Sequence, residues 1–326
     1  MHRQLNQIIV FSVCAFIALL QANELAATHP PGHCHHDSRY AVRLQQLGYD
    51  TTEEGLALAL GDRRAVISAI RYIGELDDPI LLDEVEELLL GKAGKLIGER
   101  VELGTPVAQM RIMSIKTDAA LVLAHHARES SLQWLRQWED LSDEELHALD
   151  SRTATAVARS AGKLAELGDD RLARHVRVLI HHKDVVWTVK NNAVRALGMF
   201  SDFSNEHVEQ AWLNAVNLVQ RLLTDEKPDR PESLNSFLQW VAGAARYAEN
   251  NQSNPTEAVI DAFDALADIE VDLPNAIQVR QIQGPPDRPQ PAPLEIDYNE
   301  RISGSISQSR SALARAYIRH MLPPDE

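Results

Sequence analysis

A cluster of metal-binding residue types lies close to the N-terminus. Within nine residues it holds His29, His33, Cys34, His35, His36 and Asp37. Imidazole nitrogens and thiolate sulfurs bind soft or borderline cations, so this cluster could hold Cu or Zn. The spacing lacks the two separated ligand pairs of a structural zinc site, and the Cys-x-x-Cys-His signature of haem attachment is missing. A solvated tail that binds no metal therefore remains the alternative interpretation.

Other candidates for chemistry are weaker. The pairs His125-His126 and His181-His182 are adjacent in sequence, and adjacent side chains on a helix point about 100° apart, which is poor geometry for chelating one ion. The stretch 91–95 resembles a phosphate-binding loop but is followed by Leu96 where Ser or Thr is needed. Neither His-Glu-x-x-His nor Gly-x-Ser-x-Gly occurs. We therefore predict no catalytic residues, no required cofactor and a protein that is not an enzyme.

The first residues have the pattern of an export signal. Arg3 precedes thirteen nearly continuous apolar residues at 8–20, and small residues follow at Ala22 and Ala27. This length is typical of a signal peptide and short for a membrane span, although an uncleaved anchor remains the alternative. We predict a signal peptide at 1–27, a His-rich tail at 28–38, and a periplasmic or secreted protein. Only Cys34 would remain after cleavage, so no internal disulfide is expected.

Composition and charge limit the classes of partner. The chain has 326 residues, 44% hydrophobic and 24% charged, with a formal net charge of −15. These proportions are those of a folded globular protein. The acidic balance argues against binding nucleic acid, because phosphate contacts need an excess of Lys and Arg. It also argues against attachment to an anionic membrane surface once the signal is cleaved.

The body of the chain repeats a short pattern. Residues 69–78 read AIRYIGELDD and residues 193–202 read AVRALGMFSD. Looser copies occur at 119–128, 160–169 and 244–251. Aligned on one aliphatic position, the copies are 50, 41, 33 and 51 residues apart. An irregular repeat of this size is typical of a unit made of two helices.

The apolar periodicity predicts one helix at each copy and a second helix after it. We expect the second helices at 80–90, 132–138, 172–180, 208–222 and 258–266. Small residues on the first helices would let neighbouring backbones approach closely. Gly74 and Gly198 lie near helix ends, where a left-handed residue can stop a helix. Residues 91–110 hold four glycines and a proline, and we expect them to interrupt the pattern.

One stretch carries a family resemblance. Residues 184–198, DVVWTVKNNAVRALG, resemble the first helix of the HEAT repeat family, which includes the HEAT-like repeats described in phycobilin lyases. The resemblance is clearest over roughly residues 60–222. It implies an all-α, right-handed α-solenoid of about five helix pairs, with the second helices lining a concave face. A lyase-like activity is implied by the family analogy alone.

The expected organisation places the HEAT-like solenoid at 39–283. A connector with five prolines follows at 284–293, where extended polyproline-like chain is expected. A peptide-recognition ligand is the other interpretation of this connector. Residues 294–326 would form a C-terminal capping helix, and residues 39–60 an N-terminal cap.

The function that this architecture favours is an exported scaffold or adaptor that binds another protein or a peptide. The charged positions on the expected second helices are acidic in one repeat and basic in another, which suits a partner of mixed charge. Trp134 and Trp138 share one helix face, where they serve either as core residues or as binding aromatics. The predicted binding residues are Asp83, Glu84, Glu87, Trp134, Arg174 and Arg177. The alternative function is metal handling by the His29–His36 cluster.

Overall fold

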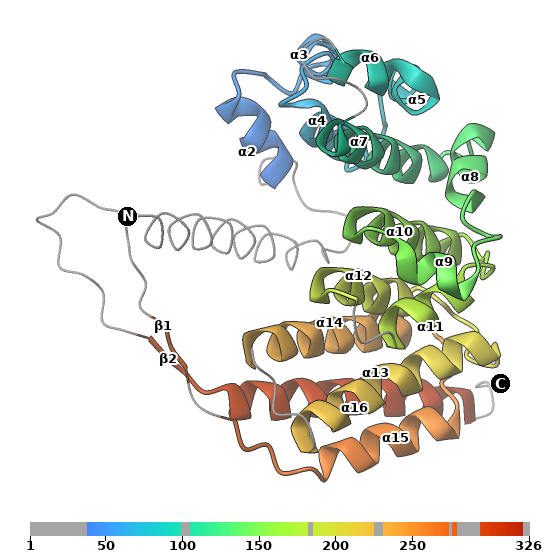
Figure 1. The fold of residues 1–326 in the computed structure, drawn as a ribbon, viewed down its shortest axis with the longest axis vertical. Helices are drawn as coiled ribbons and strands as arrows, with labels where there is room; N and C mark the ends of the chain where they lie inside the picture. Colours follow the sequence, from blue (N-terminus) through green and yellow to red (C-terminus); the bar gives the residue numbers. More distant parts are fainter. Residues whose placement is uncertain are drawn as a thin grey trace, which may run out of the picture. The chain divides into compact units, whose positions relative to one another are not determined.

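The computed structural model describes residues 38–98, 105–181, 185–224, 231–273, 276–278 and 294–321. The described chain is built almost entirely of helices, with one pair of three-residue strands (Figure 1). The helical fold class that the sequence predicts is therefore confirmed. No helix among these residues has the length and apolar character needed to cross a lipid bilayer.

The chain divides into two compact units at the junction of Glu87 and Leu88. We call residues 1–87 the N-terminal unit and residues 88–326 the C-terminal unit. This junction falls within residues 39–283, for which the sequence predicts a single HEAT-like array.

The N-terminal unit contains four helices in its described part. They are α2 (Arg39–Gln46), α3 (Glu53–Leu60), α4 (Val66–Ile73) and α5 (Leu82–Glu87). Helix α4 packs against both α2 and α3. Leu44, Leu56, Ile70 and Ile73 are fully buried where these helices meet. Each helix is too short to be stable alone, so this shared core is what holds the unit together.

The C-terminal unit begins with the short π-helix η2 (Leu88–Lys92) and α6 (Ala93–Gly98). Ten further helices follow among the described residues. They are α7 (Pro106–Ala124), α8 (Glu129–Arg136), α9 (Asp143–Ala148), α10 (Ser151–Glu166), α11 (Ala173–His181), α12 (Trp187–Leu197), α13 (Glu206–Thr224), α14 (Pro231–Asn250), α15 (Glu257–Ala267) and α16 (Tyr298–Met321). Each of the five second helices expected from the sequence coincides with a helix, the first of them with α5 and η2.

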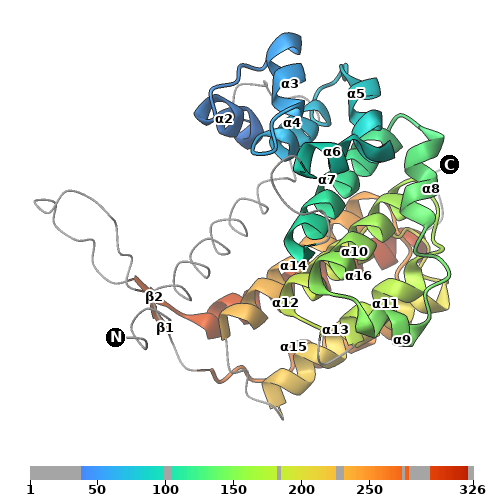
Figure 2. The same cartoon turned by 45° about the horizontal axis from the view of Figure 1, so that its top comes forward.

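Helices of the C-terminal unit contact one another in two rows (Figures 1 and 2). In the first row α7 packs on α10, α10 on α12, α12 on α14, and α14 on α16. In the second row α9 packs on α11, α11 on α13, and α13 on α15. Helix α8 contacts α7 and α10, and α16 also covers α15. Each helix therefore buries its apolar face against its neighbours in the row and against the other row.

Small residues set the spacing of the first row. A Cβ atom added to Gly162 on α10 would lie 3.1 Å from the Cα of Ala196 on α12. A Cβ atom added to Gly198, at the end of α12, would lie 2.7 Å from the Cα of Ala244 on α14. Backbones this close leave no room for a larger side chain. The close approach predicted from the small residues is therefore confirmed at two successive interfaces.

The predicted conformation of two glycines is wrong. Gly74 and Gly198 are right-handed, with φ of −69° and −64°. Among the residues that the structure describes, Gly48 and Gly168 are left-handed, and they lie just beyond the ends of α2 and α10. Gly198 is thus needed because a side chain would clash with α14. Gly168 instead supplies a positive φ, which other residues adopt only with strain.

The interruption expected at 91–110 is shorter than predicted. Helix α6 occupies Ala93–Gly98, and α7 already begins at Pro106. The side chain of Thr105 caps α7 by accepting a hydrogen bond of 3.3 Å from the backbone nitrogen of Ala108. Proline at the first position fits this helix start because its missing N–H would have no partner there.

The strands β1 (Ala276–Gln278) and β2 (Leu294–Ile296) form an antiparallel pair in which Ala276 faces Ile296 and Gln278 faces Leu294. The proline-rich connector at 284–293 lies outside the described residues. The helix predicted at 294–326 is α16, which starts at Tyr298 after the strand.

Candidate interaction surface

The two tryptophans of the α8 region have different surroundings. Their ring centroids are 5.8 Å apart and the ring planes meet at 89°, which is an edge-to-face contact. Trp138 is buried, whereas Trp134 is partly exposed. Trp138 therefore belongs to the core, and Trp134 presents part of its ring at the surface.

A buried histidine connects α11 to this aromatic pair. Nε2 of His175 lies 2.7 Å from the backbone oxygen of Trp138. A carbonyl can only accept, so Nε2 carries the proton and donates. Burial lowers the pKa of His175 below its usual value, while the hydrogen bond to Trp138 acts in the opposite direction. The hydrogen-bonded ring fixes α11 against the turn that follows α8.

Arg174 and Arg177 share one carboxylate. Nη1 of Arg174 lies 2.6 Å from Oδ1 of Asp143, at the start of α9, and Nη2 of Arg177 lies 3.7 Å from Oδ2 of the same residue. Arg174 also donates to the backbone oxygen of Leu141. The two arginine side chains remain 31% and 28% exposed. Both cations are thus held in place by α9 and still reach solvent.

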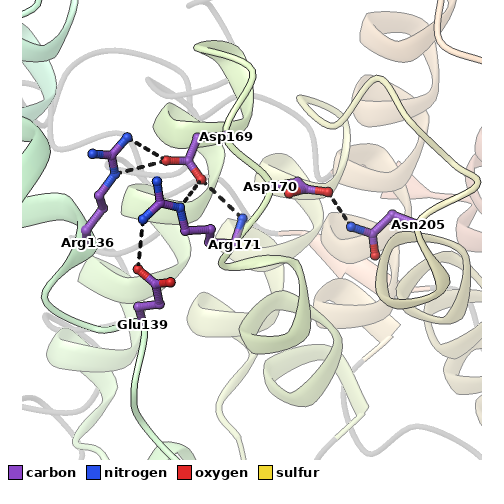
Figure 3. Close-up of polar contacts among 6 residues, drawn as sticks. All are labelled: Arg136, Glu139, Asp169, Asp170, Arg171 and Asn205. Carbon is purple, nitrogen blue, oxygen red and sulfur yellow. Dashed lines mark hydrogen bonds and ion pairs between the residues drawn. The ribbon is translucent and has the colours of Figure 1, made fainter.

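A second ionic network surrounds the turn between α10 and α11 (Figure 3). Asp169 accepts from Arg136 at 2.9 Å for Nε and 2.8 Å for Nη2. Its other oxygen lies 3.1 Å from Nε of Arg171, whose Nη1 is 3.2 Å from Oε2 of Glu139. Charge-assisted hydrogen bonds of this kind fix side-chain orientation as well as adding stability. The network joins the end of α8 to the start of α11.

Polar contacts continue from α11 to α13. Asn205, which precedes α13, donates from its side chain to Asp170 (Figure 3). The backbone oxygen of Arg177 accepts a weaker hydrogen bond of 3.5 Å from Asn214 on α13. The second row is therefore connected through its turns and along its helices.

The exposed parts of Trp134, Arg171, Arg174 and Arg177 make up what we call the arginine–tryptophan surface. Trp134 contacts Trp138, whose carbonyl binds His175, the residue after Arg174. Trp and Arg are the residue types most enriched where binding energy concentrates in protein interfaces. Because the arginines are already positioned by carboxylates, little side-chain entropy would be lost when a partner binds.

The predicted acidic residues belong to the other unit. Asp83, Glu84 and Glu87 lie on α5, where Asp83 and Glu87 are exposed and Glu84 is partly exposed. The described structure thus groups the six predicted binding residues as three in the N-terminal unit and three in the C-terminal unit.

One cluster contains none of the predicted site residues. Lys163 on α10 is only 6% exposed, and its Nζ lies 2.9 Å from Oε2 of Glu166 and 2.8 Å from Nδ1 of His125. Burial lowers the pKa of Lys163, and the charge of Glu166 partly opposes this. His125 occupies the C-terminal cap position of α7.

The predicted metal ligands His29, His33, Cys34, His35 and His36 lie outside the described residues. Within the parts of the chain that are described, no group of three or more His, Cys, Asp or Glu side chains is arranged to hold a metal ion.

The chain matches no family model, and no curated protein or solved structure is significantly similar to it.

Proposed function

We propose that the protein is an exported, non-catalytic adaptor whose C-terminal unit binds another protein through the arginine–tryptophan surface. In this proposal the two rows of helices form a HEAT-like, right-handed α-solenoid, and α8 and α11 contribute to its binding face. The observation that carries the proposal is the fixed, partly exposed pair Arg174 and Arg177 on Asp143. The partly exposed Trp134 is linked to the same helix α11 through Trp138 and His175.

The order of contacts within the rows supports the solenoid. Successive first-row helices approach through small residues at Gly162 and Gly198, and successive second-row helices pack in the same order. A stack of this kind needs covered ends, and α16 has the expected pattern of a cap. It buries Ile302, Ile306 and Leu313 while exposing arginines on its other face.

The chemistry of the surface indicates the partner. Three arginines and one aromatic ring favour a protein segment that carries carboxylates beside an apolar side chain. The carboxylates of such a segment would either replace Asp143 as partners of the guanidinium groups or bind them together with Asp143. Because the surface is fixed before binding, its charges contribute to the rate of association as well as to affinity.

Reversing two charges tests this function. The partner is first isolated by crosslinking the full chain in its native compartment, and its affinity for the purified chain is measured by calorimetry. We expect Arg174→Glu/Arg177→Glu to weaken binding about 10-fold to 100-fold, the usual consequence of losing central interface contacts worth about 1–3 kcal/mol.

The matched control is Arg310→Glu/Arg315→Glu on α16. These two arginines are also ion-paired, with Asp264 and Glu249, so the control repeats the loss of internal salt bridges at another place. The control should bind like the wild-type chain. Equal affinities for both double variants, or no protein crosslinked to the chain at all, would contradict the proposed function.

A further inference from the structure

The end of α7 contacts α10 through an unusual pair of side chains. Nζ of Lys163 lies 2.8 Å from Nδ1 of His125 and also close to Nε2 of the same ring. The third member of the cluster is Glu166, one turn further along α10, at 2.9 Å from Nζ. A buried ammonium group is thus held between one carboxylate and one imidazole.

This contact requires a neutral imidazole. A lysine ammonium group can only donate hydrogen bonds, and of the two ring nitrogens that it approaches, a neutral imidazole offers a lone pair on one. Protonated histidine has no lone pair and carries a positive charge. Protonation of His125 would therefore remove the acceptor and place two cations against each other where Lys163 is nine-tenths buried.

Few other charges act on this pair. The electrostatic influences on His125 come from Lys163, Glu166 and the neighbouring His126. Several other charged groups on the packed helices are engaged elsewhere: Arg159 with Asp118, Arg136 with Asp169, Lys190 with the backbone oxygen of Ile180, and Arg195 over the ring of Trp240. The remaining titratable side chains on α7, α10 and the elements packed against them are Lys92, Lys95, Arg111, Lys116, Glu129, Arg152, Arg174, His175, Arg177 and His181.

The protonation equilibrium has a clear direction. Partial burial of the ring, followed by the charge of Lys163, lowers the pKa of His125 below its usual 6.5. When the contact opens, the ring regains its usual pKa. The closed contact is therefore at full strength above about pH 6.5, and its contribution is lost as the pH falls through the lowered pKa.

We propose that His125 and Lys163 form an acid-sensitive contact that holds the C-terminal end of α7 against α10 and releases it when His125 is protonated. Helix α8 follows this end of α7 after a short turn in which Ala127 has a positive φ of 51°. Release would loosen the attachment of α8 and with it Trp134. The inference stands on the contact itself and does not depend on the proposed partner.

Hydrogen exchange of the full chain tests the inference. Exchange is followed by mass spectrometry at about pH 7.5 and about pH 5.5, with correction for the chemical exchange rate. In the wild-type chain, protection of peptides covering 119–128 and 160–168 should fall at the lower pH by up to about tenfold, because about pH 5.5 is one unit below the usual pKa of 6.5 that the ring regains on opening. In His125→Gln, whose amide oxygen accepts from Lys163 without titrating, protection should not change with pH.

Two further variants and one control peptide show whether the pH response comes from the contact between His125 and Lys163. His126→Gln alters the neighbouring histidine, which is exposed as His125 is, and should respond to pH like the wild-type chain. Lys163→Met removes the buried cation and should abolish the response even where His125→Gln folds poorly. Peptides covering 173–181 contain His175, whose pKa is also lowered, so their response should be the same in all variants. Equal protection of wild-type α7 at both pH values, or an unchanged response in His125→Gln, would overturn the proposal.

Discussion

Replacing Gly198 with alanine is expected to lower the free energy of unfolding by about 2 kcal/mol or more. The added Cβ would lie 2.7 Å from the Cα and 2.8 Å from the backbone oxygen of Ala244. Real Cβ atoms do not approach backbone atoms this closely, so α12 and α14 must move apart. Inserting one methyl group into a well-packed core typically costs about 1–3 kcal/mol, and a backbone neighbour cannot rotate away. Urea unfolding of the full chain, followed by circular dichroism, measures the loss.

Gly243→Ala is the matched control for this substitution. Gly243 lies on α14, next to Ala244, and an added Cβ would meet nothing within 4 Å. Alanine is favoured over glycine inside a helix by roughly 0.5–1 kcal/mol, so this variant should be as stable as the wild-type chain or slightly more stable. Equal stabilities of Gly198→Ala and Gly243→Ala would mean that α12 and α14 are not in close contact.

Replacing Trp212 with alanine is expected to cost about 3–5 kcal/mol of stability. Trp212 on α13 is fully buried. Its ring stacks on Phe203 at 5.6 Å and meets Phe263 of α15 edge-on at 6.2 Å. The substitution would leave a cavity between the α12–α13 turn, α13 and α15. The same urea unfolding measurement gives the value.

Trp134→Ala provides the contrast. Trp134 is partly exposed and would lose mainly its edge-to-face contact with Trp138, worth roughly 0.5–1.5 kcal/mol. We expect a small change in stability and, under the proposed function, a clear loss of partner affinity. Similar stability losses for Trp134→Ala and Trp212→Ala would show that Trp134 is a core residue and would remove it from the binding surface.

Much of the fold could be predicted from apolar periodicity. The pattern at 208–222 predicts a helix that the structure places at Glu206–Thr224, because the buried side chains of α13 recur every three or four residues. The small residues in the repeat also predicted a close approach of backbones, which occurs at Gly198. The left-handed conformation predicted for Gly198 is wrong. A glycine at a helix end can serve either a positive φ or a close backbone approach, and its position in the sequence does not distinguish the two.

Loop composition was a weaker guide at 91–110. Four glycines in this stretch suggested an interruption, but Thr105 and Pro106 supply a cap and a favourable first residue for α7. The helix start depends on these two residues and on tertiary packing, whereas glycine content describes the segment only on average.

The candidate site was less predictable than the helices. Arg174 and Arg177 could be selected as surface cations, but their shared partner Asp143 is 31 residues before Arg174 and is brought there by packing of α9 on α11. The contact between His125 and Lys163 spans 38 residues. No local pattern encodes either contact, because each depends on which helices become neighbours.

A hydrogen-exchange footprint of the complex tests the central claim most directly. Exchange of the full chain is measured with and without the isolated partner at neutral pH. The account predicts added protection in the peptides that cover α8 and α11, which carry Trp134, Arg174 and Arg177, and unchanged exchange in α16. Protection confined to α16 or to the N-terminal unit would contradict it.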